Sequence, residues 1–312
     1  MDPLSDVLSL LKPQSFMFRG LDLGGAWSIH FPAYQCIRCY ALLTGECWFA
    51  LDGAAAIRLR AGDCILLPRG HSFVLASELS LEPVSAASFL AGALEGGVIT
   101  HQGGGEVTGI GGYFTFANAQ SAMFLDVLPD VVHICAEADR FALRWFIERL
   151  MQELRVPQPG SYLLAQQLVQ QILVQVLRLC IAQGAVDNVG WIFALADPSM
   201  NAALSAMHAN PSNRWTLDSL AELASMSRSS FASKFKKTVG LPAIEYLSQW
   251  RMLLAKDRLV NSKDSIAVIS RSLGYESESA FSTAFKRLIG CSPRHYVSTQ
   301  QTPSTQQTRM KD

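Results

Sequence analysis

The chain has 312 residues, of which 49% are hydrophobic and 17% charged, a composition that excludes a disordered or fibrous protein. This length predicts two domains of ordinary size, each able to bury a hydrophobic core. Lys+Arg and Asp+Glu number 26 each, yet the residues from Asn213 onward carry a net charge of +7 and those before it −7, so the neutral total does not exclude a nucleic-acid partner.

The N-terminal residues give no export signal. Residues 1–6 are acidic where a signal peptide is basic, and no apolar run approaches the roughly 18 residues that a membrane-spanning helix needs. The cysteines are odd in number and lack a disulfide-like spacing, which suits a reducing compartment. They are Cys36, Cys39, Cys47, Cys64, Cys135, Cys180 and Cys291. We therefore expect a cytoplasmic protein, no membrane partner, and mostly free thiols.

Short apolar runs punctuated by turn residues fill the region from Trp27 to Leu90. The runs are residues 40–44, 47–51, 57–60, 64–67 and 73–76. Gly45-Glu46 separates the first two, and Asp52-Gly53 is a strong hairpin signal. Evenly spaced strands without a helical pattern between them predict an antiparallel barrel or sandwich.

Several of these segments resemble a known sensor domain. They are Trp27-Ser-Ile-His-Phe-Pro32, Gly45-Glu-Cys-Trp48, Asp52-Gly53, and Arg60-Ala-Gly-Asp-Cys-Ile-Leu-Leu-Pro-Arg-Gly70. Together they resemble the cupin sensor at the N-terminus of one branch of AraC-type transcription regulators, over roughly Pro3 to Leu128. The resemblance implies an antiparallel, cupin-like β-barrel.

Many cupins are metal enzymes that use a His-x-His pair with a Glu and a later His. The corresponding turn here offers only His71, and His30, His101 and His133 have no ligand-like spacing. We therefore predict no metal and no cofactor, and we interpret His71 as a residue at the end of a strand. The Gly-rich stretch 92–112 fits no phosphate-binding motif and is interpreted as a mobile loop bordering a ligand cavity.

Two cysteine pairs are redox candidates. Cys36-Ile-Arg-Cys39 resembles a CxxC motif, but it lies in a strand-like run, where residues three apart point to opposite faces. Cys47 and Cys64 are predicted on neighbouring strands, and some relatives of this sensor detect oxidants through cysteines. A relative of that kind has a Cys-Gly step where this chain has Gly109-Ile-Gly-Gly112, so core packing is the favoured role of these cysteines.

Helical periodicity begins at Asp139 and continues to Gly184. Apolar residues recur at three- and four-residue steps, and Pro157-Gln-Pro-Gly160 separates two helices. In AraC-type regulators this region commonly mediates dimerisation, so the resemblance implies a homodimer; packing within the domain is the alternative. Residues 187–210 are interpreted as a connection with a short amphipathic helix.

The C-terminal third contains a repeated unit. Residues 216–224 predict a short helix with Thr216 as N-cap and Ser219–Glu222 as a capping box, followed by a tight turn and a basic helix from Arg228. A second copy follows at an offset of 50 residues. The matches include Ser227/Ser277, Ser229/Ser279, Phe231/Phe281, Phe235/Phe285, Lys236/Lys286, Gly240/Gly290 and Tyr246/Tyr296. From Asn213 onward there are 15 Lys+Arg against 8 Asp+Glu.

These copies resemble the tandem helix-turn-helix domain of the AraC family over residues 205–298. The resemblance implies that the two recognition helices enter successive major grooves about 34 Å apart. Base readout is then predicted for Arg228, Ser229, Ser230, Ser233, Lys234, Ser277, Glu278, Ser279, Ser282 and Thr283, and phosphate contact for Lys236, Lys237, Lys286 and Arg287. Ala243, Val297 and Thr283 depart from the family pattern, and Thr283 removes a frequent arginine from the second helix.

The sequence thus predicts an α+β protein: a cupin-like antiparallel β-barrel with a helical hairpin (1–195), an all-α tandem helix-turn-helix domain (205–298) and a disordered tail (299–312). The predicted function is a sequence-specific transcription regulator that responds to a signal at the sensor. Alternatives are a cysteine-based oxidant sensor and a metal-dependent cupin enzyme fused to a DNA-binding domain. Expected partners are double-stranded promoter DNA, RNA polymerase, an unknown small-molecule or chemical effector, and a second copy of the chain.

Overall fold

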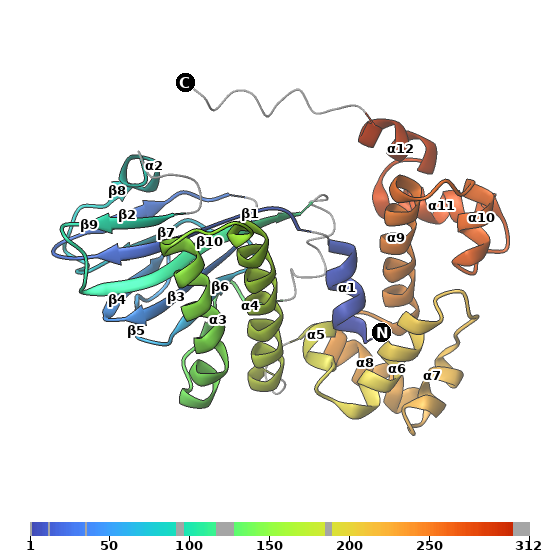
Figure 1. Ribbon diagram of the computed structural model, residues 1–312. Coiled ribbons are helices and arrows are strands. Elements are labelled where there is room, and N and C mark those ends of the chain that lie inside the picture. The colour runs from blue at the N-terminus through green and yellow to red at the C-terminus, as the bar shows by residue number, and fades with distance from the viewer. Residues whose placement is uncertain are drawn as a thin grey trace. The chain divides into compact units, whose positions relative to one another are not determined.

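The computed structural model describes residues 2–11, 13–34, 36–91, 97–116, 128–184 and 189–301. The chain divides into two compact units, one comprising Leu11–Asn188 and the other Met1–Leu10 together with Val189–Asp312. The first is rich in strands and the second is helical (Figure 1). Apart from residues 299–301, the predicted tail lies outside the described residues; those three continue a helix, so they were wrongly assigned to the tail.

The strand-rich unit contains two facing sheets (Figure 1). The first has the order β11 (Val132–Ile134), β6 (Cys64–Leu67), β3 (Ile37–Thr44), β10 (Val107–Phe116), β1 (Pro13–Leu23) and β9 (Val98–His101). The second has the order β5 (Ile57–Arg60), β4 (Glu46–Leu51), β7 (Phe73–Ala76), β2 (Ser28–Phe31) and β8 (Val84–Ser85), with the short helix α2 (Ala86–Phe89) following.

The predicted cupin-like barrel or sandwich takes the form of two facing sheets that do not close into a complete barrel. β9 and β8 are edge strands that pair in parallel with β1 and β2, which leaves no neighbour to close either sheet among the described strands. Buried side chains from both sheets share one core, in which Phe31 stacks on Phe73 at 4.7 Å between ring centroids. The α+β class itself is confirmed.

The Gly-rich stretch is more ordered than the predicted loop. Val98–His101 forms β9, and Val107 begins β10. The intervening glycines 103–105 all have positive φ, a backbone conformation that glycine adopts without steric cost, so they make the tight turn between these strands. Residues 92–96 of this stretch lie outside the described residues.

The predicted helical hairpin is present as α3 (Glu137–Arg155) and α4 (Ser161–Gly184). One face of α3 packs on the first sheet and on α4. The opposite face leaves Phe141 82% and Trp145 61% exposed, and Tyr162 near the start of α4 is 75% exposed. The hairpin therefore supplies core and also leaves an apolar surface open.

Helix α4 contains an apolar segment of a length that the sequence was not expected to hold. Its segment Ser161–Ala182 is long and apolar enough to cross a membrane, judged on length and composition alone, and 44% of that window is buried inside the protein. Core helices of this kind satisfy the same criterion, and Val169, Ile172 and Val176 of α4 are fully buried. The segment therefore differs from the expectation that no apolar run of this length is present.

The helical unit begins with a segment from the far end of the chain. Helix α1 (Pro3–Leu11) belongs to this unit together with α5 (Trp191–Ala194), α6 (Pro198–Ala209) and the helices that follow them. Val7 is 0% exposed, and Asp6 Oδ2 lies 3.5 Å from Nδ1 of the buried His208. Both α1 and α5 were expected in the sensor and instead belong to the helical unit.

His208 occupies an aromatic site at the centre of this unit. Its ring lies 3.9 Å from that of Trp250, centroid to centroid, and Nε2 lies 2.8 Å from the Tyr246 hydroxyl. Burial lowers the pKa of His208 to about 3, so the imidazole is neutral near pH 7 and packs as an aromatic ring.

Two helix-turn-helix copies complete the unit. The first consists of α7 (Leu217–Leu223) and α8 (Arg228–Val239), and the second of α10 (Ile266–Ser272) and α11 (Glu278–Ile289). Helix α9 (Ala243–Asn261) connects them, and α12 (Pro293–Gln301) follows. The capping box of α7 joins Thr216 to Ser219, three residues on, so the predicted box at Ser219–Glu222 is wrong.

Candidate DNA-binding interface and sensor cavity

The repeat places α8 and α11 on equivalent supports. Both helices begin after a serine cap, Ser227 or Ser277, and end at a left-handed glycine, Gly240 or Gly290. Each has two fully buried phenylalanines on one face: Phe231 and Phe235 in α8, Phe281 and Phe285 in α11. Residues four apart share a helix face, so the remaining positions of each helix are turned outward.

The exposed face of α8 begins at its N-terminal end. Arg228, Ser229 and Ser230 are exposed, and Ser233 is exposed one turn later. Arg228 Nη1 lies 3.3 Å from Asp218 Oδ2, with both side chains about two-thirds exposed. An exposed ion pair of this kind is weak, so the guanidinium is able to exchange the carboxylate for a base edge.

Lys234 is engaged within the protein. Its Nζ lies 2.6 Å from Asp197 Oδ2, and the lysine is only partly exposed. The other oxygen of Asp197 accepts hydrogen bonds from the N–H groups of Ser199 and Met200 at the start of α6. Lys234 thus joins α8 to α6, and a role in base readout requires it to leave Asp197.

The exposed face of α11 is less basic at its start. Glu278 Oε1 lies 3.9 Å from Arg294 Nη2 of α12, an exposed arginine that the sequence analysis omitted although it directly follows Pro293 at the helix start. Exposed residues of this face are Ser277, Glu278, Ser279 and Thr283, whereas Ser282 is partly buried. The base-reading candidates of both copies therefore lie on the outward faces of α8 and α11, Lys234 and Ser282 being only partly exposed.

Four cations lie at the C-terminal ends of these helices. Lys236 and Lys237 occupy the last turn of α8, and Lys286 and Arg287 that of α11, all of them exposed. The negative end of a helix dipole favours cations there, so these residues stabilise the helix as well as offering charge to a polyanion.

Helix α9 fixes the two copies to each other. Arg251 Nε donates to the carbonyl oxygen of Pro211 at 2.6 Å and Nη2 to that of Asn213 at 2.9 Å, while its guanidinium lies over the ring of Tyr275. Lys256 on α9 is buried beside Tyr296 of the second copy, and burial lowers its pKa to about 8. One helix therefore carries packing contacts from both repeats.

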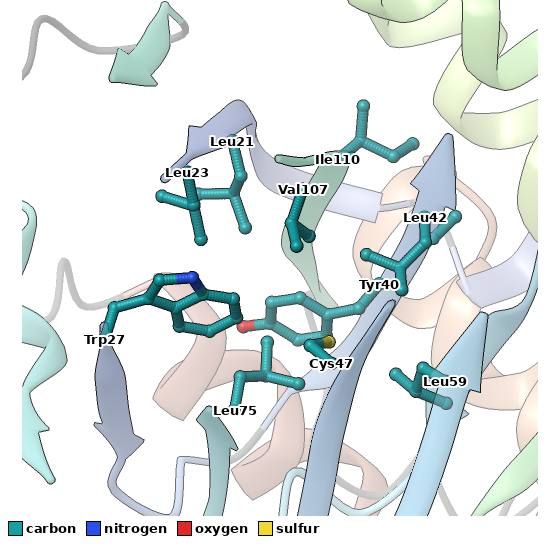
Figure 2. Close-up of a pocket in the computed structure, with 12 residues that line it drawn as sticks. Leu21, Leu23, Trp27, Tyr40, Leu42, Cys47, Leu59, Leu75, Val107 and Ile110 are labelled. Atoms are coloured by element: carbon teal, nitrogen blue, oxygen red, sulfur yellow. The ribbon is translucent and has the colours of Figure 1, made fainter. Parts of the chain in front are cut away.

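A narrow cavity lies between the two sheets of the sensor (Figure 2). Its volume is about 20 Å³, and the space between the surrounding side chains, with open solvent at the mouth, is about 350 Å³. The lining residues are Leu21, Leu23, Trp27, Tyr40, Ala41, Leu42, Cys47, Leu59, Leu75, Val107, Gly109 and Ile110. None of them carries a charge at neutral pH.

The redox candidates are not neighbours. Cys47 lies on β4 and Cys64 on β6, which belong to different sheets, so the predicted adjacency is wrong. Cys64 instead lies beside Cys39, with 3.7 Å between the sulfurs. That contact and burial raise the pKa of Cys64, and burial raises the pKa of Cys47 to about 12, so both thiols are protonated at neutral pH.

Three histidines of the sensor each lie near a different polar side chain. His71 Nε2 lies 3.2 Å from Asp130 Oδ1, His30 Nε2 lies 2.9 Å from Ser72 Oγ, and His133 Nε2 lies 3.3 Å from Asp63 Oδ2. Among the residues that the structure describes, no three His, Cys, Asp or Glu side chains are grouped so as to hold a metal ion.

Comparison with known proteins agrees with this architecture. A cupin family matches residues 2–182, beyond the range of the sequence resemblance, and a helix-turn-helix domain family matches residues 220–299. A Streptomyces antibioticus protein named as an AraC-like transcription regulator is 40% identical over 298 residues, covering 95% of this chain and 98% of the relative. The Escherichia coli RCS-specific transcriptional activator RclR is 28% identical, covering 95% and 97% respectively.

Among solved structures, the DNA-binding domain of AdpA in complex with a target DNA is 26% identical and covers 35% of this chain and 98% of that domain, with a TM-score of 0.33. The whole-length relatives and the two family matches carry the assignment. The chain belongs to the AraC-like transcription regulators that join an N-terminal cupin domain to a C-terminal helix-turn-helix domain.

Proposed function

We propose that this regulator reads promoter DNA with the exposed faces of α8 and α11. The observation that supports this most strongly is the repeated helix with a buried Phe pair, an exposed polar face and cations in its last turn. Arg228, Ser229, Ser230 and Ser233, with Ser277, Glu278, Ser279, Ser282 and Thr283, are the proposed base-reading residues, and Lys234 joins them if it leaves Asp197. Lys236, Lys237, Lys286 and Arg287 are the proposed phosphate contacts.

The DNA assignment is tested in two steps. Genome-wide mapping of bound sites identifies a specific sequence, and a gel-shift titration of the full chain on that sequence and on a scrambled one measures specificity. Equal affinity for both sequences would contradict sequence-specific binding. Regulation in the cytoplasm through RNA polymerase at the bound promoters completes the proposal, and the naming of its relatives as transcription regulators supports a non-enzymatic role.

The open face of the helical hairpin is the proposed dimer contact. Phe141 and Trp145 lie one turn apart on α3, so they share a face, and both remain mostly exposed. Exposed large apolar side chains grouped in this way mark interaction surfaces, and the resemblance of the helical region to that which commonly mediates dimerisation in AraC-type regulators favours a second copy of the chain as the partner.

We expect the double substitution Phe141→Glu with Trp145→Glu to convert the dimer into a monomer. Opposed carboxylates repel each other and the apolar contact is lost. Light scattering after size-exclusion chromatography measures the mass. Arg58→Glu together with Glu46→Arg, which reverses an exposed ion pair between β5 and β4 in the second sheet, is the control. A wild-type mass of one chain at micromolar concentration would contradict the dimer.

Signal detection at the cupin domain is the second part of the proposal. An oxidant is one candidate signal, because Cys39 and Cys64 have sulfurs 3.7 Å apart and a relative is named as RCS-specific. The raised pKa values of Cys64 and Cys47 oppose it, since the thiolate is the reactive form.

The cysteine hypothesis predicts that hypochlorite changes the DNA affinity of the wild type and that Cys64→Ser removes the effect. Cys47→Ser should keep it if Cys39 and Cys64 form the responsive pair, since Cys47 lies in the other sheet. Gel-shift titration with and without oxidant measures both. An equal response in wild type and both variants excludes these thiols. Metal analysis of the purified chain tests the remaining alternative, a metal-dependent cupin enzyme.

A further inference from the structure

The sensor cavity has a chemistry that restricts what it can hold. Its lining is made of aliphatic and aromatic side chains, one alanine, one glycine and the Cys47 thiol. Burial raises the pKa of Cys47 to about 12 and raises that of Tyr40 as well, so neither group carries charge at neutral pH. An ion placed here would lose its hydration without gaining a counter-charge, so charged ligands are excluded.

One polar group in the cavity has no partner. Trp27 is only 4% exposed, and its indole Nε1 has no hydrogen-bond acceptor among the described residues. In Figure 2 this nitrogen lies on the ring edge that faces Leu23, and the Tyr40 hydroxyl points toward the same indole. A buried donor left unpaired is costly, and a ligand acceptor placed there would relieve that cost.

We propose that this cavity binds a small, neutral, mainly apolar molecule that carries one hydrogen-bond acceptor, with Trp27 Nε1–H donating to it. The inference rests on the proposed sensing role of the cupin domain and names the class of effector. A carbonyl or ether oxygen would accept the indole hydrogen bond, and a thin hydrocarbon part would contact lining residues such as Leu21, Leu75 and Val107 after these side chains move apart.

The size of the cavity favours a thin ligand. A volume of about 20 Å³ holds roughly one water molecule, so a larger guest must displace lining side chains. Leu21 and Leu23 come from β1, which begins two residues after the end of α1. A ligand that moves these side chains therefore acts on β1, the strand that directly follows α1 in the chain. Helix α1 belongs to the DNA-binding unit.

The test compares two probes of one shape. Saturation-transfer NMR on the full chain measures binding of 2-hexanone and of n-hexane, which differ in the carbonyl group. We expect wild-type protein to bind the ketone more tightly. Trp27→Phe, which removes the donor and keeps an aromatic ring, should weaken ketone binding about tenfold and leave hexane binding within about twofold. Cys47→Leu, which fills the cavity, should weaken both probes.

Three outcomes of this binding experiment would contradict the cavity assignment. Absence of ketone binding to the wild type, an equal loss of both probes in Trp27→Phe, or undiminished binding in a folded Cys47→Leu would overturn it. Thermal unfolding and DNA affinity of each variant, measured alongside, report whether the fold is intact. If the ketone binds as expected but DNA affinity does not respond, the sensing role is overturned and the cavity assignment stands.

Discussion

Arg228→Ala is expected to lower affinity for the specific DNA site about 5- to 150-fold, the effect of losing one bidentate arginine contact of roughly 1–3 kcal/mol. Arg228 lies in the first turn of α8, and its weak exposed pair with Asp218 leaves it able to reach a base. The measurement is a gel-shift titration on specific and scrambled duplexes, in which affinity for the scrambled duplex should change little.

Two further variants distinguish a base contact of Arg228 from a phosphate contact and from an effect unrelated to DNA. Lys236→Ala with Lys237→Ala should weaken binding to both duplexes alike and lower the salt dependence by roughly one unit of slope per lysine. Arg58→Ala removes an arginine from an exposed ion pair with Glu46 in the second sheet of the sensor and should leave DNA binding unchanged. If Arg228→Ala weakens both duplexes equally, Arg228 contacts phosphate; if it has no effect, the start of α8 does not contact DNA.

Val7→Asp is expected to destabilise the DNA-binding unit by about 3 kcal/mol or more, because it places a carboxylate in a fully buried apolar site. Val7 lies on α1, beside the position that brings Asp6 to His208. The loss should appear as a lower thermal unfolding temperature and, at the growth temperature, as weaker DNA binding. The position is more than 200 residues away in sequence from α8, the proposed recognition helix.

Ser9→Asp is the matched control for this substitution. It introduces the same charge on the same helix at an exposed position, so only a small change in stability is expected. Deletion of residues 1–10 should reproduce the effect of Val7→Asp, since it removes the buried Val7 side chain from the unit. An unfolding temperature unaltered by both changes would show that α1 does not stabilise this unit in solution.

The tandem repeat was largely predictable from sequence because its determinants are local. The offset of 50 residues places the start of α11 at Glu278 and its end at Ile289, matching Arg228 and Val239 of α8. Serine caps, paired phenylalanines and terminal glycines act within one or two turns of the helix they define. The outward-facing candidates follow from the same 3.6-residue period.

The remaining features depend on contacts far apart in sequence. Strand runs in the sensor were located correctly, but their spacing does not determine whether the sheets close, and the parallel edge strands β8 and β9 leave them open. The ion pair of Lys234 with Asp197 joins residues from two helices with no shared motif. Cys47 and Cys64 lie on strands that only β5 separates along the chain, yet the strand order places them in different sheets.

The place of α1 in the DNA-binding unit has a consequence for synthesis of the chain. At translation rates of about 5–20 residues per second, the 178 residues of Leu11–Asn188 take roughly 10–35 s to emerge before the first partner of α1 appears. Throughout that interval the sensor is able to fold, while the apolar face bearing Leu4 and Val7 stays uncovered. The nascent chain therefore carries a folded sensor preceded by a helix whose apolar face is exposed to solvent. A chaperone is able to bind that face until the rest of the helical unit is synthesised.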